Sequence, residues 1–95
     1  MKGLSALMMQ ALEGLKIDTL NPMQESTIEA WREGSDLILL SPTGSGKTLA
    51  YLLPLLETLK PDVQGVQAVV LVPSRELALQ IDQVFRSMNT PFRVM

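Results

Sequence analysis

Apolar residues recur at steps of three and four near both ends of the chain. The first series comprises Leu4, Leu7, Met8, Ala11, Leu12 and Leu15, and the second comprises Leu77, Ala78, Ile81, Val84, Phe85 and Met88. This spacing places the apolar side chains on one face of a helix. We therefore predict two amphipathic helices, the first ending near Gly14 and the second beginning after a Ser74 cap.

A third helix is indicated between these two, before residue 34. Asn21 is a favourable N-cap, Pro22 suits the first helical position, and Gln24 stands at the third position. A side chain of this kind three residues after the cap can close a capping box. We expect the helix to stop around Gly34, with Ser35-Asp36 as the following turn.

Two central stretches are too short and too uniformly apolar for amphipathic helices. Residues 37–40 show no alternation, and residues 68–72 are rich in β-branched valine. Both patterns are typical of strands covered on two faces, and residues 92–95 look like the opening of a third strand. An apolar helix is expected over 49–59. Strands that alternate with helices predict an α/β fold with a parallel sheet flanked by helices. Strands covered on both faces need neighbours, so we expect a truncated part of a larger domain.

Composition narrows the possible functions. The 95 residues suffice for one small domain, and the net charge of −2 offers no general basic surface for nucleic acid. Because cysteine and histidine are absent, disulfides, thiolate metal sites and imidazole bases are excluded. The longest apolar run has eight residues, far below the roughly 20 of a membrane span. We expect a soluble, cytoplasmic protein without a signal peptide or membrane contact.

Residues 41–48 carry the strongest chemical signal. Their sequence, Ser-Pro-Thr-Gly-Ser-Gly-Lys-Thr, follows the phosphate-loop pattern G-x-x-x-x-G-K-[ST], with Ser41 at the first glycine position. The N–H groups of such a turn and of the helix that follows attract phosphate. Lys47 is placed to reach the outer phosphates, and the Thr48 hydroxyl can ligate Mg²⁺. The predicted phosphate site comprises Thr43, Gly44, Ser45, Gly46, Lys47 and Thr48.

Three segments, taken in order, resemble motifs of the DEAD-box family of ATP-dependent RNA helicases. Residues 22–24 (Pro-Met-Gln) resemble its Q motif, residues 41–48 its Walker A motif, and residues 73–78 (Pro-Ser-Arg-Glu-Leu-Ala) its motif Ia. The resemblance covers nearly the whole chain. It implies a partial RecA-like P-loop NTPase sandwich, with residues 1–95 as the N-terminal fragment of the helicase ATP-binding domain.

The same resemblance implies roles for individual residues. Gln24 would bind adenine, and Ile17 occupies the place of an aromatic residue that usually lies against it. Lys47 and Thr48 would be the catalytic residues present, binding ATP or ADP with Mg²⁺. Ser74 and Arg75 would touch the RNA backbone, a kind of contact that positions a strand without reading its sequence.

Three of these assignments have plain structural alternatives. The Gln24 amide could merely close the capping box on Asn21, although it also matches the N6/N7 edge of adenine. Arg75 could be solvated, or could pair with Asp82 or Glu76. The phosphate loop itself could be a simple glycine turn with a surface lysine.

The predicted function is that of the ATP-binding portion of an ATP-dependent RNA helicase. The parent protein would hydrolyse ATP to unwind or remodel RNA, whereas residues 1–95 alone lack the Asp-Glu-Ala-Asp motif and are expected to be inactive. The alternatives are a P-loop helicase or translocase acting on DNA, a nucleotide-binding interaction module without turnover, and a structural unit with no ligand. Unpaired strand edges are expected to make the fragment self-associate.

Overall fold

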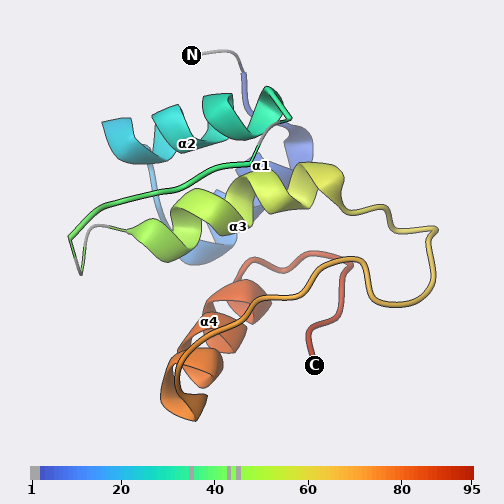
Figure 1. Ribbon diagram of the computed structural model, residues 1–95. Coiled ribbons are helices and arrows are strands. Elements are labelled where there is room, and N and C mark those ends of the chain that lie inside the picture. Colours follow the sequence, from blue (N-terminus) through green and yellow to red (C-terminus); the bar gives the residue numbers. More distant parts are fainter. Residues whose placement is uncertain (1–2, 35, 43, 45) are drawn as a thin grey trace.

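The computed structural model describes residues 3–34, 36–42, 44 and 46–95. The described part contains four helices, α1 (Ala6–Leu15), α2 (Pro22–Arg32), α3 (Lys47–Thr58) and α4 (Arg75–Ser87). Figure 1 shows them joined by extended segments, of which residues 36–42 lead towards α3 and residues 59–74 link α3 to α4. None of the described helices is long and apolar enough to cross a membrane.

The predicted parallel sheet is wrong. No described residue lies in a β-strand, and the segments 37–40, 68–72 and 92–95 are extended without ladder pairing. Two of these segments are also far from buried, because Ile38 is 85% exposed, Leu40 89% and Leu71 90%. A short apolar run favours an extended backbone, but it does not specify a partner, and a strand is stabilised only through its pairing with neighbours.

Helices α2 and α4, by contrast, begin at the predicted caps, whereas the cap of α1 was not predicted and α3 begins two residues before the predicted range 49–59. Ser5 caps α1 by accepting from the Met8 N–H at 3.2 Å, and Ser74 caps α4 by accepting from the Leu77 N–H at 3.2 Å. Asn21 caps α2 with Pro22 in the first turn. Such caps satisfy N–H groups that otherwise lack an intrahelical partner.

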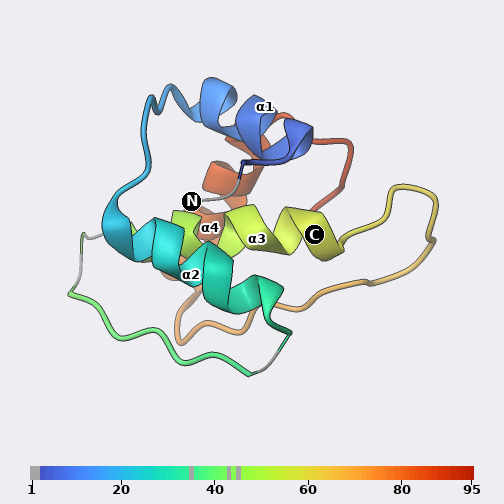
Figure 2. The ribbon, with the colours of Figure 1, turned by 90° about the horizontal axis from the view of Figure 1, so that it is seen from above.

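The core lies between helices. Seen from above, α3 runs between α1 and α2 (Figure 2), and α1 also packs against α4. The buried apolar residues are Met8, Ala11, Leu12, Ile28, Leu49, Ala50, Leu52, Leu53, Leu56, Ile81, Phe85 and Met88. Helix α3 supplies the middle of this core on several of its sides, which agrees with its nearly continuous apolar sequence.

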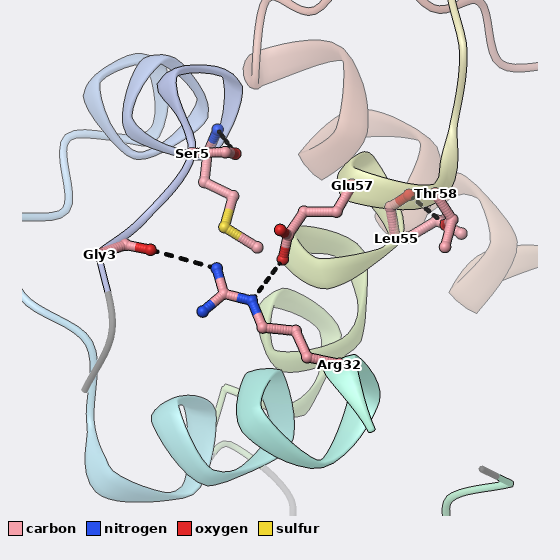
Figure 3. A network of polar contacts seen from close by, with 7 residues as sticks. Gly3, Ser5, Arg32, Leu55, Glu57 and Thr58 are labelled. Atoms are coloured by element: carbon pink, nitrogen blue, oxygen red, sulfur yellow. Dashed lines mark hydrogen bonds and ion pairs between the residues drawn. The ribbon is translucent and has the colours of Figure 1, made fainter. Parts of the chain in front are cut away.

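A polar contact joins the ends of α2 and α3 to the N-terminal segment (Figure 3). The Arg32 guanidinium pairs with the Glu57 carboxylate at 2.9 Å and donates to the Gly3 carbonyl at 3.2 Å. Both charged side chains are between a quarter and a third exposed. A pair of this kind contributes on the order of 0.5–1 kcal/mol and fixes which helix ends meet.

Gly14 lies close to the end of α1, as predicted, but it does not end the helix; it lets the end of α4 approach α1 closely. The left-handed residue that ends the helix is Lys16, with φ 59°. A Cβ on Gly14 would lie 2.4 Å from the backbone oxygen of Ser87, near the end of α4. The same contact region holds a hydrogen bond from the Gln10 amide to the Asn89 carbonyl at 2.7 Å. The absence of a side chain at Gly14 therefore lets α1 and α4 meet.

Gly14→Ala is expected to destabilise the chain even though alanine is the better helix former. The gain in helix propensity is about 1 kcal/mol, whereas overpacking against an immobile backbone atom costs about 1–3 kcal/mol. Chemical denaturation should show a net loss of up to about 2 kcal/mol in the free energy of unfolding. Gly3→Ala serves as the control, because a Cβ there would have nothing within 4 Å. A Gly14→Ala protein at least as stable as the wild type would contradict the close approach.

Candidate nucleotide-binding site

Helix α3 begins without the side-chain cap that the other three helices have. Its N-cap is Gly46, in the left-handed region at φ 90°, and no side chain accepts from its first turn in the described structure. Its first turn carries no acidic residue either. The N–H groups of the first turn are therefore available to an anion, and the positive end of the helix dipole also favours an anion there.

Lys47 and Thr48 are the first two residues of α3, and both are half-buried. The positive end of the helix dipole disfavours a lysine at this position. Within the described part of the chain, no carboxylate pairs with Lys47. A phosphate group would offset both the unfavourable dipole and the missing carboxylate, because it would bind the Lys47 ammonium group and the N–H groups of the helix start.

Tyr51 lies one turn after Thr48, and sequence reasoning assigned it no role. Burial raises the pKa of its phenol, and a hydrogen bond with the Thr48 side chain lowers that pKa in part. The net direction is upward from a usual value near 10, so the phenol stays protonated at neutral pH. The Thr48 hydroxyl, predicted to ligate Mg²⁺, therefore has a neutral hydrogen-bonding neighbour.

Gln24 is brought to this helix start from α2. Its side chain is only 6% exposed, and its Nε2 donates to the Gly46 carbonyl at 3.2 Å. Its Oε1 accepts from the Asn21 N–H at 2.9 Å, while the Asn21 Oδ1 accepts from the Gln24 N–H at 2.8 Å. The capping box predicted from sequence is thus confirmed, and the same amide reaches the phosphate loop 22 residues away.

Gly46 is required at its position for two reasons. Its left-handed φ is unfavourable for residues with a side chain. An added Cβ would also lie 2.6 Å from Gln24 Nε2, so the amide would have to shift. The loop and the start of α2 are therefore in direct contact at Gly46.

The remaining predicted residues are placed less closely. Gly44 has φ 83° with open space around it, whereas Thr43 and Ser45 lie outside the described residues. Ile17 is half-buried against the helical core. Hence the described structure brings together Gln24, Gly46, Lys47 and Thr48, and it leaves the adenine contact of Ile17 as a prediction.

Ser74 and Arg75 start α4 and are exposed. Ser74 is the cap described above, and none of the described hydrogen bonds joins either residue to the phosphate loop. The alternative pairing of Arg75 with Asp82 is not seen, because Asp82 instead accepts from Arg86 at 3.0 Å. Within the described residues Arg75 has no acidic partner, and its contact with RNA stays a prediction.

A surface pocket of about 570 Å³ lies at the other end of α3, lined by Trp31, Arg32, Gly34, Leu37, Glu57 and Thr58. Its two charged residues already pair with each other. No group of three or more Asp, Glu, Cys or His side chains that could hold a metal occurs in the described part of the chain. The chemistry expected of a nucleotide site is therefore concentrated at the start of α3 and not in this pocket.

Comparison with known families supports the predicted family. The family model for the DEAD/DEAH box helicase matches residues 21–95, which include Gln24, the loop and the start of α4. The chain belongs to the DEAD/DEAH box helicase family.

Individual members of the DEAD/DEAH box helicase family are similar over most of the chain. A probable ATP-dependent RNA helicase, YfmL of Bacillus subtilis, is 54% identical over 68% of this chain. The DEAD-box ATP-dependent RNA helicase CshC of Bacillus cereus is 46% identical over 86%, and the ATP-dependent RNA helicase DeaD of Escherichia coli is 37% identical over 96%. The matches span 17%, 21% and 14% of these relatives, respectively.

The described residues fit the phosphates of a nucleotide, as expected for a DEAD/DEAH box helicase. The helix start is free of a capping side chain, Gly44 has open space around it, and Lys47 lacks a carboxylate partner in the described part. Sequence reasoning found these residues through the loop pattern. It missed the contact between Gln24 and Gly46, because neither the pattern nor the capping box specifies which distant carbonyl the amide reaches.

Proposed function

We propose that the chain is the ATP-binding portion of an ATP-dependent RNA helicase. The observation that carries this proposal is the start of α3, where Lys47 follows a left-handed glycine at a helix end without a side-chain cap. Family membership supports ATP as the nucleotide, since the relatives above are named ATP-dependent RNA helicases. In a protein of the relatives' length, this chain would form part of the domain that binds ATP.

The residues at and near the loop would each contact a different part of the bound nucleotide and its Mg²⁺. The N–H groups of the loop and of the first turn of α3 would surround the phosphates, and Lys47 would neutralise the outer ones. Thr48 would be the ligand that this chain offers to Mg²⁺, with Tyr51 orienting its hydroxyl. When bound, Mg²⁺ supplies charge neutralisation between the phosphates. Gln24 and Ile17 would face the adenine.

RNA would be contacted through the start of α4. Ser74 and Arg75 are exposed, and Arg75 lacks an acidic partner in the described part of the chain. An arginine beside helix N–H groups suits a backbone phosphate. The overall charge of −2 indicates that such contacts would be local.

Hydrolysis needs groups beyond those described here. Phosphoryl transfer requires a second carboxylate for the metal and a residue that orients water, so we expect no turnover by the 95 residues alone. The alternatives are a helicase or translocase acting on DNA, and an interaction module that binds nucleotide without turnover. If RNA stimulates ATP hydrolysis by a protein of the relatives' length, the RNA helicase is favoured. If only DNA stimulates it, the helicase or translocase acting on DNA is favoured. The absence of cysteine supports a cytoplasmic location as part of the proposal.

Lys47→Ala tests the nucleotide site directly. Mg-ADP at 100 times its dissociation constant should stabilise the wild type by about 2.7 kcal/mol. Loss of the ammonium group should weaken binding about tenfold or more, because it removes a charge-assisted contact with phosphate. Thermal-shift titration measures both effects, and Lys60→Ala, at an exposed lysine beyond the other end of α3, is the matched control. Lack of stabilisation in the wild type, or equal stabilisation in both variants, would contradict the proposal.

The proposal also includes self-association, now through exposed apolar segments and not through strand edges. The two exposed apolar segments, residues 37–40 and 66–71, contain Leu37, Ile38, Leu40, Val66, Val69, Val70 and Leu71 as exposed large apolar residues. The chain exposes 6943 Å², whereas a compact protein of its mass exposes about 5,400 Å². The excess of about 1,500 Å² is larger than the area of about 800 Å² that each partner buries in a standard protein interface. A second copy of the chain could cover these segments.

Sedimentation equilibrium at rising protein concentration should therefore show dimers or larger species. Replacing Ile38 and Leu71 together by serine should shift the equilibrium towards monomer. Burial of each apolar side chain in the dimer contributes on the order of 1.5–3 kcal/mol, and serine lacks this contribution. Met95→Ser is the control, because Met95 is fully exposed but outside both segments. A wild-type chain that stays monomeric at high concentration would rule out this part of the proposal.

A further inference from the structure

We infer that residues 66–72 bind the same residues of a second copy of the chain, as two antiparallel strands about a two-fold axis. The inference rests on the self-association included in the proposed function, and it names the segment and the geometry of that contact. In a single chain these residues are extended but unpaired, within the connection from α3 to α4 (Figure 1). They would therefore form a strand only in the dimer.

The composition of the segment suits pairing between chains. Its sequence is Val-Gln-Ala-Val-Val-Leu-Val, with four valines and with no charged residue, glycine or proline. Segments of about six or seven residues with high β-propensity and low charge are those that form strands between separate chains. The other exposed apolar segment, residues 37–40, has only four residues, and Pro42 soon follows it without an N–H to donate. Residues 66–72 are therefore the better strand of the two.

The backbone of this segment has no partner within the described part of the chain. None of the described backbone–backbone hydrogen bonds involves residues 66–72. A row of unpaired N–H and C=O groups is a template for a further strand. The start of the segment is also fixed, because the Gln67 amide accepts from the Lys60 N–H at 2.8 Å and donates to the Lys60 carbonyl at 2.9 Å. Part of the ordering that pairing requires is therefore already present.

Alternate side chains of the segment differ in their exposure. Val69 is 73% exposed and Leu71 90%, whereas Val70 is 43% exposed and Val72 packs against the helical core. A period of two is that of a strand. One apolar face of the segment is thus partly covered by the chain itself, and the other is open to solvent. Pairing with a second copy would add cross-strand contacts on the open face.

The partner that fits this segment is a second copy of the segment itself. The chain exposes more excess surface than one partner contributes to a standard interface. A two-fold contact uses the same residues from both copies, so the central residue, Val69, would face Val69 of the second copy, and Leu71 would face Gln67. A parallel pair would be less stable per residue and would bring the two positively charged Arg75 side chains side by side. The antiparallel pair is therefore favoured.

Single cysteines test this geometry, because the chain has no cysteine of its own. Val69→Cys, Leu71→Cys and Leu79→Cys are oxidised mildly at a concentration where sedimentation shows dimers, and the rate of disulfide-linked dimer formation is measured. Facing Cα atoms of antiparallel strands are about 4.5–5.5 Å apart, which a disulfide can span. The two copies of residue 71 would be about 13 Å apart along the strand, which it cannot span. Leu79, 57% exposed on α4, is the control outside the segment.

We expect Val69→Cys to form linked dimers about tenfold faster or more than Leu71→Cys and Leu79→Cys, although residue 71 is the more exposed. Equal rates at residues 69 and 71 would overturn the inference, because they indicate a parallel pair or random collision. Circular dichroism should show the helices of each variant unchanged, since these residues lie outside the buried core.

A lysine pair checks which apolar segment forms the interface. Val69→Lys would place like charges opposite each other, so it should raise the dissociation constant of the dimer about tenfold or more. Ile38→Lys, in the other apolar segment, should change it less than about threefold, as expected of a charge outside the contact. A larger effect of Ile38→Lys than of Val69→Lys would overturn the inference, because residues 37–40 would then form the interface.

The outcomes separate this contact from the proposed function. A wild-type chain that stays monomeric refutes the proposed self-association and this contact with it. A dimer without faster linkage at residue 69 refutes only the contact. The Mg-ADP titration of the wild type and Lys47→Ala decides the nucleotide site in either case.

Discussion

The contact on which the candidate site depends is the hydrogen bond between the Gln24 amide and the Gly46 carbonyl. It joins two helix starts that are far apart in sequence, and it does so at the helix that lacks a side-chain cap in the described structure. A buried amide with defined partners for both of its ends has a single favourable orientation. The loop before α3 is consequently tied to α2, and the two helices also share the apolar core.

The helical core explains how the chain can hold this site without a sheet. Helix α3 is covered by α2 on one side and by α1 on another, so its starting residues are presented on a packed element. Helix α4 is held through α1, where Gly14 permits the close approach to Ser87. The two exposed apolar segments lie outside this core, and they contribute to the large exposed surface of the chain.

The features that could be predicted from the sequence depend on residues close together in the chain, and most of those that could not depend on residues far apart. The helix starts at Asn21 and Ser74 could be predicted because a cap involves residues three positions apart, whereas the similar cap at Ser5 was missed. The phosphate loop could be recognised because its chemistry is contained within eight residues. The sheet was predicted wrongly, since residues 37–40 and 68–72 indicate burial and extension but not a pairing partner. The contact between Gln24 and Gly46 and the role of Gly14 depend on packing between distant segments, so no local pattern could reveal them.

The central claim is that the start of α3 is the nucleotide site. Backbone chemical shifts of the chain, followed by NMR while Mg-ADP is added, test it residue by residue. The account predicts the largest changes at Gly44, Gly46, Lys47 and Thr48, with smaller ones at Gln24. Changes concentrated instead around Trp31 and Thr58, at the pocket beside the other end of α3, would contradict it.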